Sequence, residues 1–270
     1  LQSLNIKVVT LANNHILDVN PSPVGTIQFL KDGGIEACGA GKNIEEAGKP
    51  VLLRHGNEEY VFLAFGWETI QCVAASRNRP GVNPLRPKHV LESVRNGRRA
   101  HPDARIVLLM HWNYELELYP QPMHRQLSFA AVEAGASAVI GSHSHCVQGV
   151  EICGDAPIVH GLGNWFLPDG VFFGGRLAYP DFAKRQLAFE WDADSGEMAC
   201  HWFEYQAVNH NVTFIKSEEL TESQWIEELT PYRSMDQEDY AEWFRLHRRK
   251  RILLPVYTRF NQTLLNWIKD

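Results

Sequence analysis

The chain has 270 residues, of which 44% are hydrophobic, 21% charged and 11% aromatic, a composition typical of a globular protein rather than a disordered or fibrous one. Lys and Arg number 26 against 32 Asp and Glu, so the net charge is −6 and no basic excess is present to bind a phosphate backbone. This charge balance argues against nucleic acid as a partner. No stretch reaches the roughly 18–20 apolar residues that span a bilayer, so we expect no membrane segment in this chain.

Strands and helices alternate through the first part of the sequence, a pattern typical of βαβ units around a mostly parallel sheet. Residues 51–54 and 60–65 flank a Gly-Asn turn and predict a β-hairpin. The polar connection over 68–87 contains three prolines and predicts a functional loop. The other predicted elements are strands near 6–12, 35–38, 105–110 and 137–140, and helices over 23–33, 88–100 and 123–134.

The alternation stops after residue 147, where short strands are joined by Gly-rich turns. Strands over 186–192 and 197–205 surround an Asp-x-x-Ser-Gly turn, which predicts an antiparallel hairpin. The tail holds two helical patterns and a basic run over 247–251, which we interpret as a solvated helix face without a function. We therefore expect an α/β domain over residues 1–215 and a C-terminal helical extension over 216–270.

The five cysteines are scattered without a CxxC pair, so they indicate neither a disulfide framework nor a thiolate zinc site. An odd cysteine count favours a reducing compartment, and hence the cytoplasm. A segment upstream of this chain would carry any signal or anchor, so association with the cell envelope stays open.

Several of the 12 histidines directly follow predicted strands. The loops concerned are Ala12–His15, His111–Glu115 and Gly141–His145. Because the carboxyl ends of parallel strands meet at one edge of a sheet, we expect these loops to converge. Imidazole nitrogens, carboxylates and amide oxygens together suit zinc, manganese or iron. Each histidine alone is most simply a structural residue, but three such loops predict a metal or catalytic centre.

Four motifs, LANNHILD, HWNYELELYP, GSHSHCVQGVE and HGLGNWF, follow one another in the first 170 residues. In order and spacing they resemble the CapA, or poly-γ-glutamate capsule synthesis, family of the calcineurin-like metallophosphoesterase superfamily. The resemblance implies an αββα sandwich with mixed sheets and a centre of one or two divalent ions, manganese, iron or zinc. Such a centre can activate water and stabilise charge on a phosphoryl oxygen.

The resemblance also implies the metal ligands. One ion would be held by Asn14, His111 and His143, and the other by His145. The superfamily's two acidic motifs are expected ahead of LANNHILD, yet residues 1–10 contain no acidic residue. The N-terminal part of the family pattern is thus missing, and a two-ion, one-ion or empty centre stays open.

Further roles follow from the same resemblance. His15 would assist at the scissile phosphate, and Asp18 would either orient His15 through a hydrogen bond or serve as an ordinary helix-start residue. Glu115 and Asn164 are candidates to fix the imidazole tautomers, with a surface carboxylate and a turn asparagine as the simpler interpretations. Asn113 stands where the family usually has glycine.

Arg77 and Arg79 in the long polar loop are candidates to bind an anionic substrate, because an acidic protein needs local positive charge for this purpose. Loop arginines are more often merely solvated.

Three functions remain open at this point. The first is a metal-dependent phosphoester hydrolase of poly-γ-glutamate or capsule biosynthesis. The second is a non-catalytic component that binds the polymer through a fold with a degenerate metal site. The third is hydrolysis of the polymer's amide bonds by the same centre. All three imply an anionic polymer or a phosphorylated small molecule as the partner.

Overall fold

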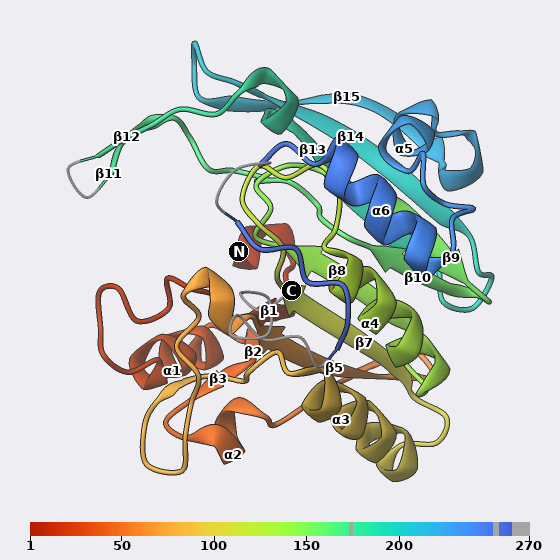
Figure 1. Ribbon diagram of the computed structural model, residues 1–270. Coiled ribbons are helices and arrows are strands. Elements are labelled where there is room, and N and C mark those ends of the chain that lie inside the picture. The colour runs from red at the N-terminus through yellow and green to blue at the C-terminus, as the bar shows by residue number, and fades with distance from the viewer. Residues whose placement is uncertain (173–174, 251–253, 261–270) are drawn as a thin grey trace. The chain divides into compact units, whose positions relative to one another are not determined.

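The structure is a computed structural model that describes residues 1–172, 175–250 and 254–260 (Figure 1). Parts of the predicted C-terminal extension, including Arg251 of the basic run, lie outside the described residues. The chain forms two compact units. The first unit comprises Leu1–Trp112 and Leu127–Gly141, and the second comprises Asn113–Gln126 and Ser142–Asp270.

The main sheet of the first unit contains the predicted hairpin and the strand that ends at His111. Strand β4 pairs antiparallel with β5, and β5 pairs parallel with β7. Ile106, Leu108 and Met110 on β7 are almost fully buried, as expected for a central strand. The strands follow one another in the order β4 (Val51–His55), β5 (Glu58–Gly66), β7 (Arg105–His111) and β8 (Ala138–Ser142).

Four helices accompany these strands, at the positions that the apolar periodicity predicts for three of them. Helix α3 starts with Pro87 at its first position, where the missing N–H costs nothing, and it buries Val90 and Val94 one turn apart. It packs against β5 and β7 (Figure 1). The helices are α1 (Val24–Asp32), α2 (Ile44–Ala47), α3 (Pro87–Ala100) and α4 (Pro122–Glu133).

Two small strand pairs complete the first unit. They are β1 (Val8–Thr10) with β2 (Glu36–Cys38), which is parallel, and β3 (Ala40–Gly41) with β6 (Gly81–Val82), which is antiparallel. The predicted long loop contains only β6 and a 3-10 turn. Arg86 closes this loop on itself, because its Nε and Nη2 atoms donate to the two carboxylate oxygens of Glu68 over 2.8 and 2.9 Å.

The second unit is antiparallel, as the Gly-rich turns predict. Asp192 Oδ1 accepts hydrogen bonds from the amides of Asp194 and Ser195 and so shapes the predicted hairpin turn. A strand not expected from the sequence, β15, pairs with β14 along an edge and is exposed at most positions, so its hydrophobic pattern is weak. The strands are β9 (Val150–Cys153), β10 (Ala156–Val159), β11 (Gly170–Phe172), β12 (Gly175–Leu177), β13 (Arg185–Trp191), β14 (Met198–Gln206) and β15 (Asn211–Glu219).

The two predicted C-terminal helices are α5 (Gln224–Leu229) and α6 (Gln237–His247). Asp236 caps α6 by accepting from the amides of Glu238 and Asp239 over 2.9 Å each. The interpretation of the basic run as a solvated helix face is wrong for Arg248. The helix ends before this residue, whose side chain is buried and donates from Nη1 to the Leu254 carbonyl.

Within the described residues, no helix is both long and apolar enough to cross a membrane.

Candidate metal centre

Three predicted site residues of the second unit lie together. Glu115, from the loop after β7, and His143 and His145, from the loop after β8, each offer a ligand atom within 4.8 Å of the others. Glu115 was expected only to orient a ligand, and the structure places its carboxylate among the ligand atoms. We call these three residues the ligand trio.

The loop that carries the two histidines has an uncommon backbone. His143 and His145 have φ angles of 88° and 55°, in the left-handed region that residues other than glycine rarely adopt. The loop is held in this shape by its neighbours, because the Leu116 amide donates to the Ser144 carbonyl over 2.6 Å and Ser144 Oγ donates to the Cys146 carbonyl over 2.8 Å. A strained backbone that is fixed from several sides is typical of functional sites.

Asn164, a candidate from the sequence to fix an imidazole tautomer, contacts the trio. Its Oδ1 atom lies 2.6 Å from Nδ1 of His145. An amide oxygen can only accept, so Nδ1 of His145 carries the proton and Nε2 is left with its lone pair for a cation.

Tyr179 also borders the trio, although no motif in the sequence marks it. Its ring centroid lies 5.8 Å from that of His145. Burial, together with the negative charges of Glu115 and Asp169, raises the pKa of Tyr179 to about 12. The phenol is therefore a neutral hydrogen-bond donor beside the trio.

The donor set fits a borderline divalent ion. Bonds of about 2.0–2.2 Å put two donors of one ion up to about 4.4 Å apart, so the trio reaches a shared ion with small side-chain adjustments. Cys146 follows His145 directly, but burial raises the pKa of its thiol to about 12. This thiol donates to the carbonyl oxygen of Glu117 over 3.3 Å. The trio itself offers one carboxylate and two imidazoles, which suit zinc, manganese or iron.

The predicted site residues of the first unit form a second group, linked by hydrogen bonds. Nε2 of His111 lies 2.9 Å from Oδ1 of Asn14, and Nδ2 of Asn14 lies 3.1 Å from Nε2 of His15. Nδ1 of His15 lies 2.7 Å from Oδ2 of Asp18, so the expected contact between these two side chains is present. The His15 side chain is 65% exposed, which leaves its ring accessible to a substrate.

The two loop arginines belong to the first unit. Arg79 Nη2 donates to the Ala74 carbonyl over 3.1 Å, which gives this side chain a local role in the loop. Arg77 is exposed. Their role as substrate ligands stays a prediction.

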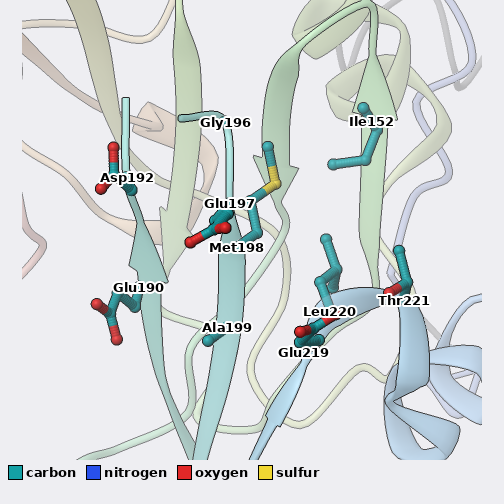
Figure 2. A pocket seen from close by; sticks show the side chains of 10 residues that line it. All are labelled: Ile152, Glu190, Asp192, Gly196, Glu197, Met198, Ala199, Glu219, Leu220 and Thr221. Carbon is teal, nitrogen blue, oxygen red and sulfur yellow. The ribbon is translucent and has the colours of Figure 1, made fainter. Parts of the chain in front are cut away.

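A cavity of about 440 Å³ lies elsewhere in the second unit, between β9 and the sheet of β13 to β15 (Figure 2). Ile152, Met198 and Leu220 line its apolar part, and acidic side chains of β13 and the following turn lie around it. It contains none of the predicted site residues.

A comparison with protein families finds a match over the part of the chain that carries the four motifs. The family described as "Bacterial capsule synthesis protein PGA_cap" matches residues 1–168, which is more than half of the chain. The chain belongs to this family.

Curated relatives of this PGA_cap chain carry names from the same biology. It is 28% identical over 172 residues to the PGA biosynthesis protein CapA of Bacillus subtilis, covering 63% of this chain and 45% of that protein. It is 30% identical over 208 residues to a probable polyglutamine synthesis accessory protein of Mycobacterium tuberculosis, covering 73% of this chain and 54% of that protein. The PGA_cap chain thus spans about half the length of these relatives.

Among solved structures, the PGA_cap chain is similar to a 5′-nucleotidase precursor from Thermus thermophilus. The TM-score is 0.42 at 12% identity, over 81% of this chain and 39% of that one. This likeness concerns the fold alone.

Proposed function

We propose that this chain carries a divalent-metal-dependent hydrolase site that acts in the synthesis of poly-γ-glutamate or a related anionic capsule polymer. The observation that supports this proposal best is the ligand trio, because a carboxylate and two imidazoles from two separate loops lie within 4.8 Å of one another. Membership of the capsule synthesis family supplies the biological setting. The bond proposed to be cleaved is a phosphoester. The alternative is hydrolysis of the polymer's amide bond at the same centre.

The roles of the individual residues follow from their chemistry. Glu115, His143 and His145 would hold a manganese, iron or zinc ion, which when bound polarises a phosphoryl or carbonyl oxygen. Asn164 fixes the tautomer of His145. Tyr179 presents a neutral donor beside the same residues.

Asn14 and His111 are proposed as ligands of a second ion of the same kinds. His15 is proposed as the proton donor to the leaving group. The carboxylate of Asp18 at 2.7 Å holds the imidazole in one orientation.

Elemental analysis after loading with manganese, iron or zinc tests the proposal. We expect at least one ion per chain, with strong loss of metal in His143→Ala and His111→Ala. His201→Ala is the matched control, because His201 is on β14 and its ring contacts Glu190 and Ser217 instead. A wild-type chain that binds no metal would contradict the proposal, as would a chromogenic phosphodiesterase activity that ignores chelators.

A second candidate is a component that binds the polymer without cleaving it. The hydrogen bond between His111 and Asn14 favours this candidate, because the two predicted ligand atoms already satisfy one another without a cation. Titration with poly-γ-glutamate and with free glutamate separates the two functions. Tight polymer binding by a chain that holds no metal would support the second candidate.

A further inference from the structure

The basic run after α6 carries an arginine that the proposed function has not used. The chain leaves α6 at His247 and then contacts the loop that bears Glu115. The amides of Arg249 and Lys250 donate to the two carboxylate oxygens of Glu117 over 2.8 and 3.1 Å. Because Glu117 is fully buried, these contacts fix the backbone at Arg249.

Glu117 also connects this segment to the histidine loop. Its carbonyl oxygen accepts from Nε2 of Gln148 over 2.8 Å and from the thiol of Cys146 over 3.3 Å. The position of Arg249 is therefore tied to the same backbone that positions the ligand trio.

The side chain of Arg249 is exposed but held in one place. Its guanidinium carbon lies 4.1 Å from the ring centroid of Phe182, a stacked arrangement that limits the rotamers of the arginine. Its Nη1 atom is 3.5 Å from the carbonyl oxygen of Leu116, the residue next to Glu115. The guanidinium thus contacts the loop that bears Glu115 and, among the described residues, forms no ion pair with a carboxylate.

The positive charge of Arg249 favours the binding of an anion. The chain has a net charge of −6, and the exposed carboxylate of Glu115 repels an approaching anion. A guanidinium offers a planar fork of N–H donors that matches a carboxylate or a phosphate. Stacking on Phe182 lowers the entropy lost when this fork binds, because the side chain is already ordered.

We propose that Arg249 binds the anionic group of the substrate, a carboxylate or a phosphate, next to the ligand trio. The proposal deepens the proposed function and rests on it for the location of the substrate. It differs from the sequence-based choice of Arg77 and Arg79, which belong to the other unit.

The test compares the wild-type chain with Arg249→Gln, Arg249→Lys and Arg245→Gln. Arg245 is exposed near the end of α6 and serves as the matched control for loss of a surface charge. Inorganic phosphate and γ-linked tetraglutamate are titrated calorimetrically against each chain, with and without Mn²⁺. Metal content and melting temperature are measured in parallel.

We expect Arg249→Gln to weaken anion binding by about tenfold to a hundredfold, which is the usual effect of a lost charged hydrogen bond. Arg249→Lys should lose less of the affinity for the anion, and Arg245→Gln should bind the anion as tightly as the wild type does. Metal content and melting temperature should not change. A loss confined to phosphate assigns a phosphoryl group to Arg249, and a loss confined to tetraglutamate assigns a carboxylate.

Equal affinities in the wild type and Arg249→Gln would overturn the proposal, as would a wild type that binds neither anion. The proposal is also overturned if Arg245→Gln loses as much affinity for the anion as Arg249→Gln does. It is likewise overturned if Arg249→Gln binds less metal or has a lower melting temperature than the wild type. A wild type without metal would overturn the proposed hydrolase site, while the titrations without Mn²⁺ would still decide whether Arg249 binds the anion.

Discussion

Nε2 of His111 lies 2.9 Å from Oδ1 of Asn14, although the two residues are 97 positions apart in the sequence. His111 is the last residue of β7 and Asn14 follows β1, so strand ends bring them together within the first unit. Both atoms are potential metal ligands, and a cation bound by both would replace this hydrogen bond.

This pair leads to a prediction about coupled ligands. If Asn14 and His111 hold the same ion, Asn14→Ala and His111→Ala should remove the same fraction of bound manganese. The double variant should then bind no less than the worse single variant, because residues that act as one unit are not additive. Stoichiometry and affinity are measured by calorimetry. Additive losses would show that the two residues act separately.

Asn164 should control the affinity of the trio for its ion. Asn164→Ala frees the His145 ring, and removal of such a supporting contact typically lowers metal affinity by about 10- to 100-fold. Asn164→Asp keeps an acceptor and should bind metal more tightly than the alanine variant. Competition with a chelator measures the affinity, and Asn209→Ala in an exposed turn is the control. An unchanged affinity in Asn164→Ala would remove this residue from the site.

A buried ion pair should dominate the stability of the second unit. Arg125 donates from Nε and Nη2 to the Glu151 carboxylate over 2.8–3.1 Å, and both side chains are almost fully buried. Glu151→Gln leaves an uncompensated buried charge on Arg125 and should lower the free energy of unfolding by about 3–5 kcal/mol. Urea denaturation measures the change. A loss below about 1 kcal/mol would contradict this account.

The same pair predicts how stability depends on pH. Burial opposes ionisation of Glu151, but hydrogen bonds from His160 and Arg125 outweigh it and lower the pKa of this carboxyl below 4.5. A carboxyl whose pKa is lowered by folding adds to stability at pH values above its unfolded-state pKa. This contribution is lost as the pH falls through the folded-state pKa. The wild type should therefore lose more of its free energy of unfolding below pH 4.5 than Glu151→Gln does. Parallel curves for the two chains would contradict the prediction.

Asn113 should be more stabilising than a glycine at this position. Its φ angle is 65°, which glycine also accepts, but its side chain makes three contacts that glycine lacks. Oδ1 accepts from the Gln121 amide and from Nδ1 of His124, whose pKa burial lowers to about 3, and Nδ2 donates to Gln148.

We expect Asn113→Gly to lower the free energy of unfolding by about 1–3 kcal/mol, because buried partners are left unsatisfied. Asn113→Ala should lower the free energy of unfolding by about 1 kcal/mol more, because the left-handed backbone also strains alanine. Urea denaturation of the two variants gives the comparison. Equal stabilities would show that the backbone conformation carries no strain.

Much of the fold could be predicted from the sequence because the decisive signals are local. The apolar spacing of Val90 and Val94 identifies α3, and the continuous apolar run before His111 identifies β7. The same locality explains the prediction of the histidine loops, since a polar residue directly after a buried strand must lie at a sheet edge. The Asp192 turn likewise depends only on its own side chain and the next amides.

Contacts between distant segments were decided by the tertiary structure alone. Glu115 joins the ligand atoms because Leu116 binds the backbone at Ser144 and sets the direction of the loop, which no periodicity reveals. Glu117 and Arg249 are 132 positions apart, and a basic run after a helix gives no sign that its amides meet a buried carboxylate. The sequence alone determined which residue types stand at the strand ends, because those signals are short in range. The partners of each charge depended on which backbone amides and carboxylates the folded chain brings together, because burial makes those contacts selective.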